Sequence, residues 1–220
     1  MRAELAPGAG YFWEDWFFLL AGEIIEVSHG SKTMTTMAAA AICCPELLDQ
    51  CVAGDPRAWR ELHAAYRPQA VSFLLRLGVR PREADDACQE IFLQVFRYLH
   101  RFERRADFRT WLYKLCISQA ARARRRALLT RSLRWISGAP TEAVATPDFS
   151  SARSWALVDG ALSILSRRQR EVFVLFEFEL LPTAEIARLL GAPPATVRRQ
   201  LQEARQKFEG FIRAQPLGGG

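Results

Sequence analysis

Apolar residues recur at helical spacing along the chain from Pro45 onward. The clearest case is the segment that opens at Pro81, where apolar positions fall at i, i+1, i+4, i+5 and i+8, one face of a 3.6-residue period. These positions are Ile91, Phe92, Val95, Phe96 and Leu99. No alternating, strand-like pattern has comparable strength, so the sequence predicts an all-α protein.

Capping and breaking residues divide the first part of this pattern into helices. Asp55 and Pro56 are an N-cap followed by proline at the first helical position, and Gly78 ends the helix that they begin. Pro68 should kink or restart this helix. A third helix should end at the arginines before residue 127, and its buried face is expected to comprise Phe108, Trp111, Leu112 and Leu115.

The second part of the pattern predicts three further helical segments. Leu157, Ala161, Leu162 and Leu165 form one helical face, and Ser166 with Gln169 forms a capping box that starts the next helix. After it, Thr183 should cap a short helix that Gly191 ends, and Pro194 should begin the last one. The inner face of this last helix is predicted to be Val197, Leu201, Ala204 and Phe208.

These elements predict two small helical domains, at 45–127 and 153–214, joined by a flexible linker at 128–152 that is rich in turn residues. Residues 1–44 have no lasting period, and we expect a disordered N-terminal extension there. Met34 and Met37 lie just before the first patterned segment, which suggests the hypothesis that the native start is near them.

Two short helices joined by a glycine-containing turn are typical of a DNA-binding helix-turn-helix. On the second helix, polar side chains point away from the buried face, and arginine and glutamine there can read guanine and adenine in the major groove. These candidate reading residues are Thr196, Arg198, Arg199 and Gln200. Arg205 lies further along and is a candidate for phosphate contact. A helical hairpin with a solvated basic face is the alternative that this segment alone leaves open.

Charge distribution adds a second candidate for DNA contact. The formal net charge is +6, and Arg97 to Arg134 holds twelve Lys or Arg residues against Glu103 and Asp107. Arginines mixed with aromatic side chains are typical of segments that capture single strands. The candidates are Arg104, Arg105, Arg109, Lys114, Arg122 and Arg125, while Phe108, Trp111 and Leu112 are expected to be core.

Enzyme and metal motifs are missing from the sequence. Cys43, Cys44, Cys51, Cys88 and Cys116 have no spacing typical of a zinc site, and there is no phosphate-binding glycine loop. We therefore expect no catalytic residue, no metal, no cofactor and no small-molecule substrate. The apolar stretch near Tyr11 is interrupted by acids, so the chain is predicted to be cytoplasmic and not membrane-embedded.

Four blocks, in order, resemble bacterial RNA polymerase sigma factors of the sigma-70 family. They begin at Gly54-Asp55-Pro56, Ala84-Asp85-Asp86, Phe102 and Leu165-Ser166-Arg167, and the last continues through Glu185-Ile186-Ala187 and Ala195-Thr196-Val197. The blocks leave no room for an intervening domain, which is typical of the extracytoplasmic-function (ECF) type. Ser118 and Arg122 stand where the family often has Asn and Asp, and Ala195 replaces a glycine.

The resemblance implies a transcription initiation factor with three binding surfaces. An acidic and polar cluster would bind core RNA polymerase, and it comprises Asp85, Asp86, Gln89, Glu90 and Gln94. The basic region from Arg101 to Arg126 would bind and open the promoter −10 element, and the helix-turn-helix would read the −35 element. An anti-sigma protein is an expected partner.

Two alternatives remain at this stage. The first is a stand-alone helix-turn-helix regulator that binds a palindromic duplex without polymerase. The second is a helical adaptor that binds only protein.

Overall fold

The computed structural model describes residues 45–103, 107–137 and 151–215, and in these residues the chain forms helices and no strand. This confirms the all-α prediction. The first half contains α2 (Pro45–Val52), α3 (Pro56–Arg76), α4 (Pro81–Tyr98), the short η2 (Leu99–Arg101) and α5 (Phe108–Ser137). The second half contains α6 (Ser151–Ser163), α7 (Arg167–Phe173), η3 (Val174–Phe178), α8 (Thr183–Leu190) and α9 (Pro194–Ala214). Residues 1–44, with the expected N-terminal extension, lie outside the described part.

The helix starts follow the predicted caps, with one correction. The Asp55 side chain accepts a hydrogen bond from the backbone N–H of Arg57, at 2.8 Å, and Pro56 opens α3. Ser166 and Gln169 form the predicted capping box of α7. Thr183, however, is the first residue of α8 and not its cap, because Pro182 holds the extended N-cap conformation.

Two helices run further than predicted. α3 continues through Pro68 to Arg76 without a restart. α5 continues to Ser137, into the segment predicted as linker. The turn residues that suggested the linker begin only at Ser137, so nothing in residues 128–136 breaks a helix. The rest of the expected linker, 138–150, lies outside the described residues.

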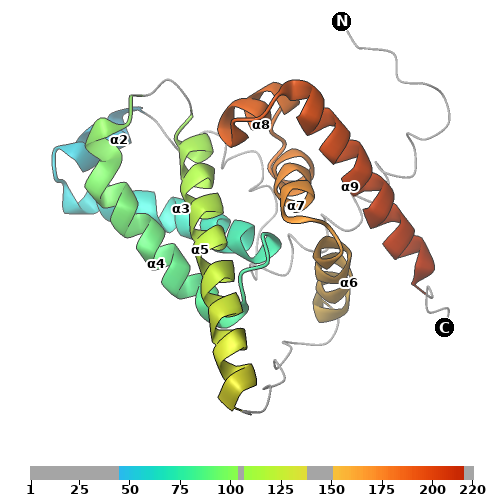
Figure 1. The fold of residues 1–220 in the computed structure, drawn as a ribbon. Coiled ribbons are helices and arrows are strands. Elements are labelled where there is room, and N and C mark those ends of the chain that lie inside the picture. Colours follow the sequence, from blue (N-terminus) through green and yellow to red (C-terminus); the bar gives the residue numbers. More distant parts are fainter. Residues whose placement is uncertain (1–44, 104–106, 138–150, 216–220) are drawn as a thin grey trace, which may run out of the picture.

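The two halves pack against each other. One continuous cluster of buried apolar residues includes Phe73 and Leu112 of the first half and Phe173 and Ile186 of the second. Figure 1 shows the second half beside the first, with α8 next to the start of α5 and α9 on the side away from α5. The helix-turn-helix therefore belongs to a half that packs against the first half.

Candidate functional site

α9 buries one stripe and exposes another. Its buried residues are Val197, Leu201, Ala204, Phe208 and Ile212, which confirms the predicted inner face and extends it by one turn. Phe208 stacks on Phe173 of α7, with ring centroids 4.8 Å apart. Gly191 makes the turn before α9 in the left-handed conformation, with φ 59°, as a C′ glycine does. The packing fixes which side of α9 faces solvent.

The solvent-facing side of α9 carries the residues predicted to read bases. Arg198 and Arg199 are exposed, and Thr196 and Gln200 are half-buried beside them. Arg205 lies two turns further along α9, at i+7 from Arg198, where its Nε donates to Glu177 Oε1 at 2.6 Å and its guanidinium lies over the Phe176 ring. A phosphate contact by Arg205 would have to share the guanidinium with Glu177.

A basic stripe runs along α5. Lys114, Ser118, Arg122 and Arg125 are all exposed, and their spacing of i, i+4, i+8 and i+11 places them on one face of the helix. Ser118 therefore joins the three predicted basic residues as a surface position. Three of its four members are basic and none is acidic, so the stripe presents positive charge to solvent.

The start of α5 is arranged differently. Arg104 and Arg105 lie outside the described residues. Arg109 is half-buried, its backbone N–H donates to Asp107 Oδ1 at 3.0 Å, and its Nε is buried without a hydrogen-bond partner. Phe108 is buried as predicted, and so is Leu112, but Trp111 is only half-buried and packs on Phe102 with ring centroids 5.3 Å apart. Trp111 is thus only partly a core residue.

The predicted acidic and polar cluster lies on the outer side of α4. Asp85, Asp86, Gln89 and Glu90 are exposed, and Gln94 is half-buried. Asp85 also receives a hydrogen bond from Arg67 Nη2 of α3, at 2.7 Å, between two exposed side chains. Such a surface ion pair is worth little to stability, so the carboxylate remains open to exchange of partners.

Apolar side chains stand among these acids, and sequence reasoning misplaced one of them. Phe96 was predicted to lie on the buried face, but it is 62% exposed, and Leu93 is 48% exposed. Ile91, Val95 and Leu99 take the core side at i, i+4 and i+8, and the adjacent seam points outward. Phe96 rests on half-buried Trp59, with ring centroids 4.9 Å apart. The sequence did contain a signal for the exposure of Phe96. The apolar face of α4 is two rows wide, and the core covers only the row of Ile91, Val95 and Leu99.

No other described feature suggests chemistry. The described residues contain no cluster of His, Cys, Asp and Glu that could hold a metal, and none of their helices is long and apolar enough to cross a membrane. Cys51, Cys88 and Cys116 are buried free thiols. Burial raises the pKa of Cys88 to about 11, which keeps this thiol protonated and unreactive.

Comparison with known families matches both halves. The family model for sigma-70 region 2 matches residues 62–128, and the model for sigma-70 region 4 matches residues 156–208. RNA polymerase sigma-H factor of Pseudomonas aeruginosa is 28% identical over 78% of this chain and 94% of its own length. ECF RNA polymerase sigma factor SigD of Mycobacterium tuberculosis is 30% identical over 74% of this chain and 81% of its own length.

Solved structures show the same fold. CnrH, in a complex with the cytosolic domain of CnrY, has a TM-score of 0.60 and 22% identity over 77% of this chain and 97% of its own. The sigma factor RpoE, in a complex with the anti-sigma factor NepR from Bartonella quintana, has a TM-score of 0.59 and 18% identity over 71% of this chain and 97% of its own.

These matches, together with a helix-turn-helix and a separate basic helix on one all-helical body, define a transcription initiation factor. The chain belongs to the sigma-70 family of RNA polymerase sigma factors, in its ECF subfamily. It directs core RNA polymerase to promoters and binds DNA in doing so.

Proposed function

We propose that three surfaces of this sigma factor each make one of the contacts needed for transcription initiation. The outer face of α4 binds core polymerase, the basic stripe of α5 contacts the −10 region, and the start of α9 enters the −35 major groove. The observation that carries the proposal is the contrast between the faces. On α4, exposed carboxylates share the outer face with exposed Leu93 and Phe96, whereas the exposed positions at the start of α9 are basic or neutral.

The α4 surface has the composition of a protein interface. Phe96 and Leu93 supply apolar area, and the exposed polar groups of Asp86, Gln89 and Glu90 precede them by one to three turns on the same helix. Aromatic side chains that fill a partner's pocket contribute most of the binding energy in such interfaces, and a polar rim excludes water around them. A partner with basic and polar groups around an apolar hollow fits this surface.

The α5 and α9 surfaces have the composition of nucleic-acid interfaces. Lys114, Arg122 and Arg125 can neutralise phosphates along one side of a strand. At α9, Arg198 and Arg199 can each donate two hydrogen bonds to guanine, and Gln200 can pair with adenine. The half-exposed ring of Trp111 lies beside Phe102 at the start of α5, where an unpaired base could stack on it.

An anti-sigma protein is proposed as the partner that holds this chain inactive. Two proteins with the same fold were solved in complexes, one with the cytosolic domain of CnrY and the other with the anti-sigma factor NepR. Titration of a purified anti-sigma candidate into a transcription assay should remove the product, and excess sigma factor should restore it. We propose that this regulation takes place in the cytoplasm, where polymerase and promoter DNA are found.

Run-off transcription with purified core polymerase on genomic templates tests the main proposal. We expect promoter-dependent products that require this chain. Arg198→Ala should reduce the product from promoters with a −35 element and leave the affinity for core polymerase unchanged. If Arg198→Ala weakens core binding instead, the assignment of the two surfaces is wrong.

A further inference from the structure

Gln169 of α7 joins α7 to α9 through its side-chain amide. The residue is only 5% exposed. Its Nε2 donates to Glu203 Oε2 of α9 at 2.9 Å, and its Oε1 accepts from Lys207 Nζ of α9 at 3.0 Å. The two partners lie one turn apart on α9, so a single buried side chain of α7 contacts both of them.

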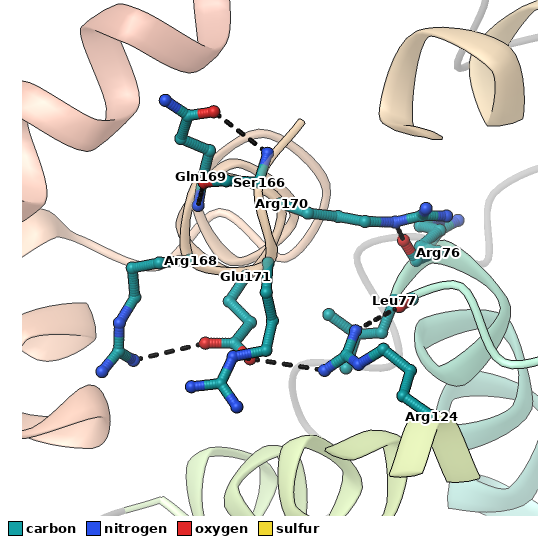
Figure 2. A network of polar contacts seen from close by, with 9 residues as sticks. Arg76, Leu77, Arg124, Ser166, Arg168, Gln169, Arg170 and Glu171 are labelled. Carbon is teal, nitrogen blue, oxygen red and sulfur yellow. Dashed lines mark hydrogen bonds and ion pairs between the residues drawn. The ribbon is translucent and has the colours of Figure 1, made fainter. Parts of the chain in front are cut away.

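The same amide also closes the capping box at the start of α7. Its Oε1 accepts from the backbone N–H of Ser166 at 3.1 Å, and the Ser166 hydroxyl accepts from the backbone N–H of Gln169 at 3.3 Å. Figure 2 shows this end of α7, where the Gln169 amide turns back to the Ser166 nitrogen on the side of the helix away from Arg124. With Lys207, the Ser166 N–H uses both lone pairs of the amide oxygen, which fixes the side chain in one orientation.

An amide at position 169 suits both partners on α9 at once. A glutamate there would complete the capping box and accept from Lys207, but it could not donate to Glu203. A lysine or arginine could donate to Glu203, but it could not accept from Lys207 or from the backbone of Ser166. The choice of glutamine is therefore explained by α9 as well as by the start of α7.

Glu203 connects the buried amide to a candidate base-reading residue. Its Oε2 accepts from Gln169, and its Oε1 lies 3.9 Å from the Nε of Arg199, one turn earlier on α9. The Arg199 side chain is 68% exposed. The ion pair engages the Nε side of the guanidinium, so both Nη groups remain available to the O6 and N7 acceptors of a guanine.

The anchor on α7 distinguishes this ion pair from an ordinary one. An exposed ion pair orders its side chains weakly, because both partners lose rotamer freedom when it forms. Glu203 is already held by Gln169, so only Arg199 has freedom left to lose. Arg213 and Glu209 form a pair of the same spacing on the same helix, at 3.6 Å, and no contact within the described part of the chain ties Glu209 to α7.

The neighbouring arginine has no comparable support. Within the described residues, the ion pairs of α9 involve Arg199, Arg205 and Arg213, and none involves Arg198. Arg198 and Arg199 are adjacent and both exposed, yet only Arg199 has an anchored carboxylate beside it. The two arginines therefore differ in how far they are ordered before DNA is bound.

We propose that Gln169 is a positioning residue for recognition of the −35 element, and that it acts through Glu203 to hold Arg199 in the orientation that reads a guanine. The inference rests on the proposed function, which places the start of α9 in the −35 major groove. An arginine that is ordered beforehand loses less conformational freedom on binding, and its fixed orientation favours guanine over the other bases.

A guanine analogue tests the contact that Arg199 makes. 7-Deazaguanine pairs with cytosine but lacks the N7 acceptor that a bidentate arginine needs. The holoenzyme is bound to the −35 duplex of a promoter found by run-off transcription, with each guanine replaced in turn, and the ratio of the two Kd values reports the N7 contact. Arg199→Ala should bring this ratio to one at a single guanine. If the ratio depends on Arg199 at no guanine, the proposal is wrong.

Gln169→Glu tests the positioning role. This variant keeps the capping box and the acceptor for Lys207, but it places a carboxylate against Glu203. We expect the ratio at the Arg199 guanine to fall by about twofold to tenfold, the cost of ordering one long side chain on binding. Added charge changes affinity for both duplexes alike and cancels in the ratio. Glu209→Gln is the control and should leave the ratio unchanged. The same ratio in Gln169→Glu and in the unmodified chain would overturn the proposal.

Glu203→Gln removes the charged link without altering α7, and it covers the case in which Gln169→Glu fails to fold. Loss of a negative charge beside DNA should raise affinity for both duplexes. The ratio at the Arg199 guanine should nevertheless fall. Higher affinity with an unchanged ratio would mean that Glu203 acts only through its charge, and the positioning role would be refuted.

Motion of the arginine side chains in the free full chain separates failure of this proposal from failure of the proposed function. NMR relaxation of the Nε–H groups reports their order on the picosecond to nanosecond timescale. We expect Arg199 to be more ordered than Arg198, and Gln169→Glu to remove the difference. Equal order in the unmodified chain rejects the positioning role, whatever the transcription assay gives. An ordered Arg199 in a chain that supports no promoter-dependent transcription rejects the proposed function, and guanine reading with it.

Discussion

α4 and α9 begin alike and differ in what they expose. Each starts with a proline at its first turn, Pro81 or Pro194, without a side-chain cap, and each buries a stripe of apolar residues at helical spacing. On its outer face α4 adds carboxylates and exposed Leu93 and Phe96, whereas the described residues of α9 include no large exposed apolar side chain. Two amphipathic helices with similar buried stripes can thus suit different kinds of partner, and the residues on the outer face determine which partner each helix suits.

The difference has a simple physical basis. A protein partner repays the burial of apolar area, so exposed rings on a helix favour a protein interface. Duplex DNA presents phosphates and polar base edges, which favour arginine and glutamine and repel carboxylates. The acids of α4 would keep that helix away from the duplex while α9 approaches it.

The largest expected effect comes from Phe96→Asp. A charge in the apolar part of the proposed polymerase surface should lower affinity for core polymerase by about a hundredfold or more, in the range of interface hot spots. The side chain is 62% exposed, so the fold should be retained. Binding to immobilised core polymerase measures the effect. Val52→Asp is the control: Val52 is also an exposed apolar residue, but it lies on α2, and this variant should bind normally. Normal binding by Phe96→Asp would remove α4 from the interface.

Arg198→Ala is expected to have the next largest effect, on recognition of promoter DNA and not on binding of core polymerase. Loss of a bidentate base contact costs about 1–3 kcal/mol, which corresponds to a loss of roughly 5- to 150-fold in use of a −35 element. Competition between promoters with intact and altered −35 elements measures it. Arg213→Ala, near the other end of α9, is the control, because its ion pair with Glu209 stays within the helix. An equal loss in both variants would indicate general charge and not base reading.

Many of the helix boundaries and buried faces could be predicted from the sequence. The caps at Asp55 and Ser166, the glycine turn at Gly191 and the buried stripe of α9 follow from local rules, because each depends on residues a few positions apart. The exposure of Phe96 could not be predicted from periodicity, since it depends on which neighbouring helix covers which seam of α4. The partners of Glu179 lie on α3 and α5, and no local pattern connects residues so far apart in the sequence.

Arg122→Gln should have a moderate effect that depends on salt. Arg122 is exposed on the α5 stripe, at a position where the family often has Asp, and it is proposed to meet a phosphate. Loss of one such contact reduces the slope of log affinity against log salt concentration by about one. Titration of the holoenzyme with a −10 fragment at several salt concentrations measures the slope. Affinity for core polymerase should not change, and an unaltered slope would remove Arg122 from the DNA surface.

The smallest expected effect is a pH dependence where the two halves meet. Burial raises the pKa of Glu179 above its usual value, although Arg76, Tyr113 and Arg109 each act to lower it. Tyr113 remains a donor, because burial and then the neighbouring Glu179 raise the pKa of its hydroxyl. The folded chain therefore binds a proton on Glu179 more tightly than the unfolded chain does.

This contribution to stability is fully present below the ordinary glutamate pKa of 4.5 and is lost as pH rises through the raised pKa of the folded state. Denaturant unfolding at a series of pH values measures it. Glu179→Gln, which mimics the protonated side chain, should flatten this component and change stability little at neutral pH, whereas Glu209→Gln on α9 should leave the pH dependence intact. A marked loss of stability in Glu179→Gln at neutral pH would mean that the ion pair with Arg76 outweighs the cost of burial, and that the halves are held together by charge.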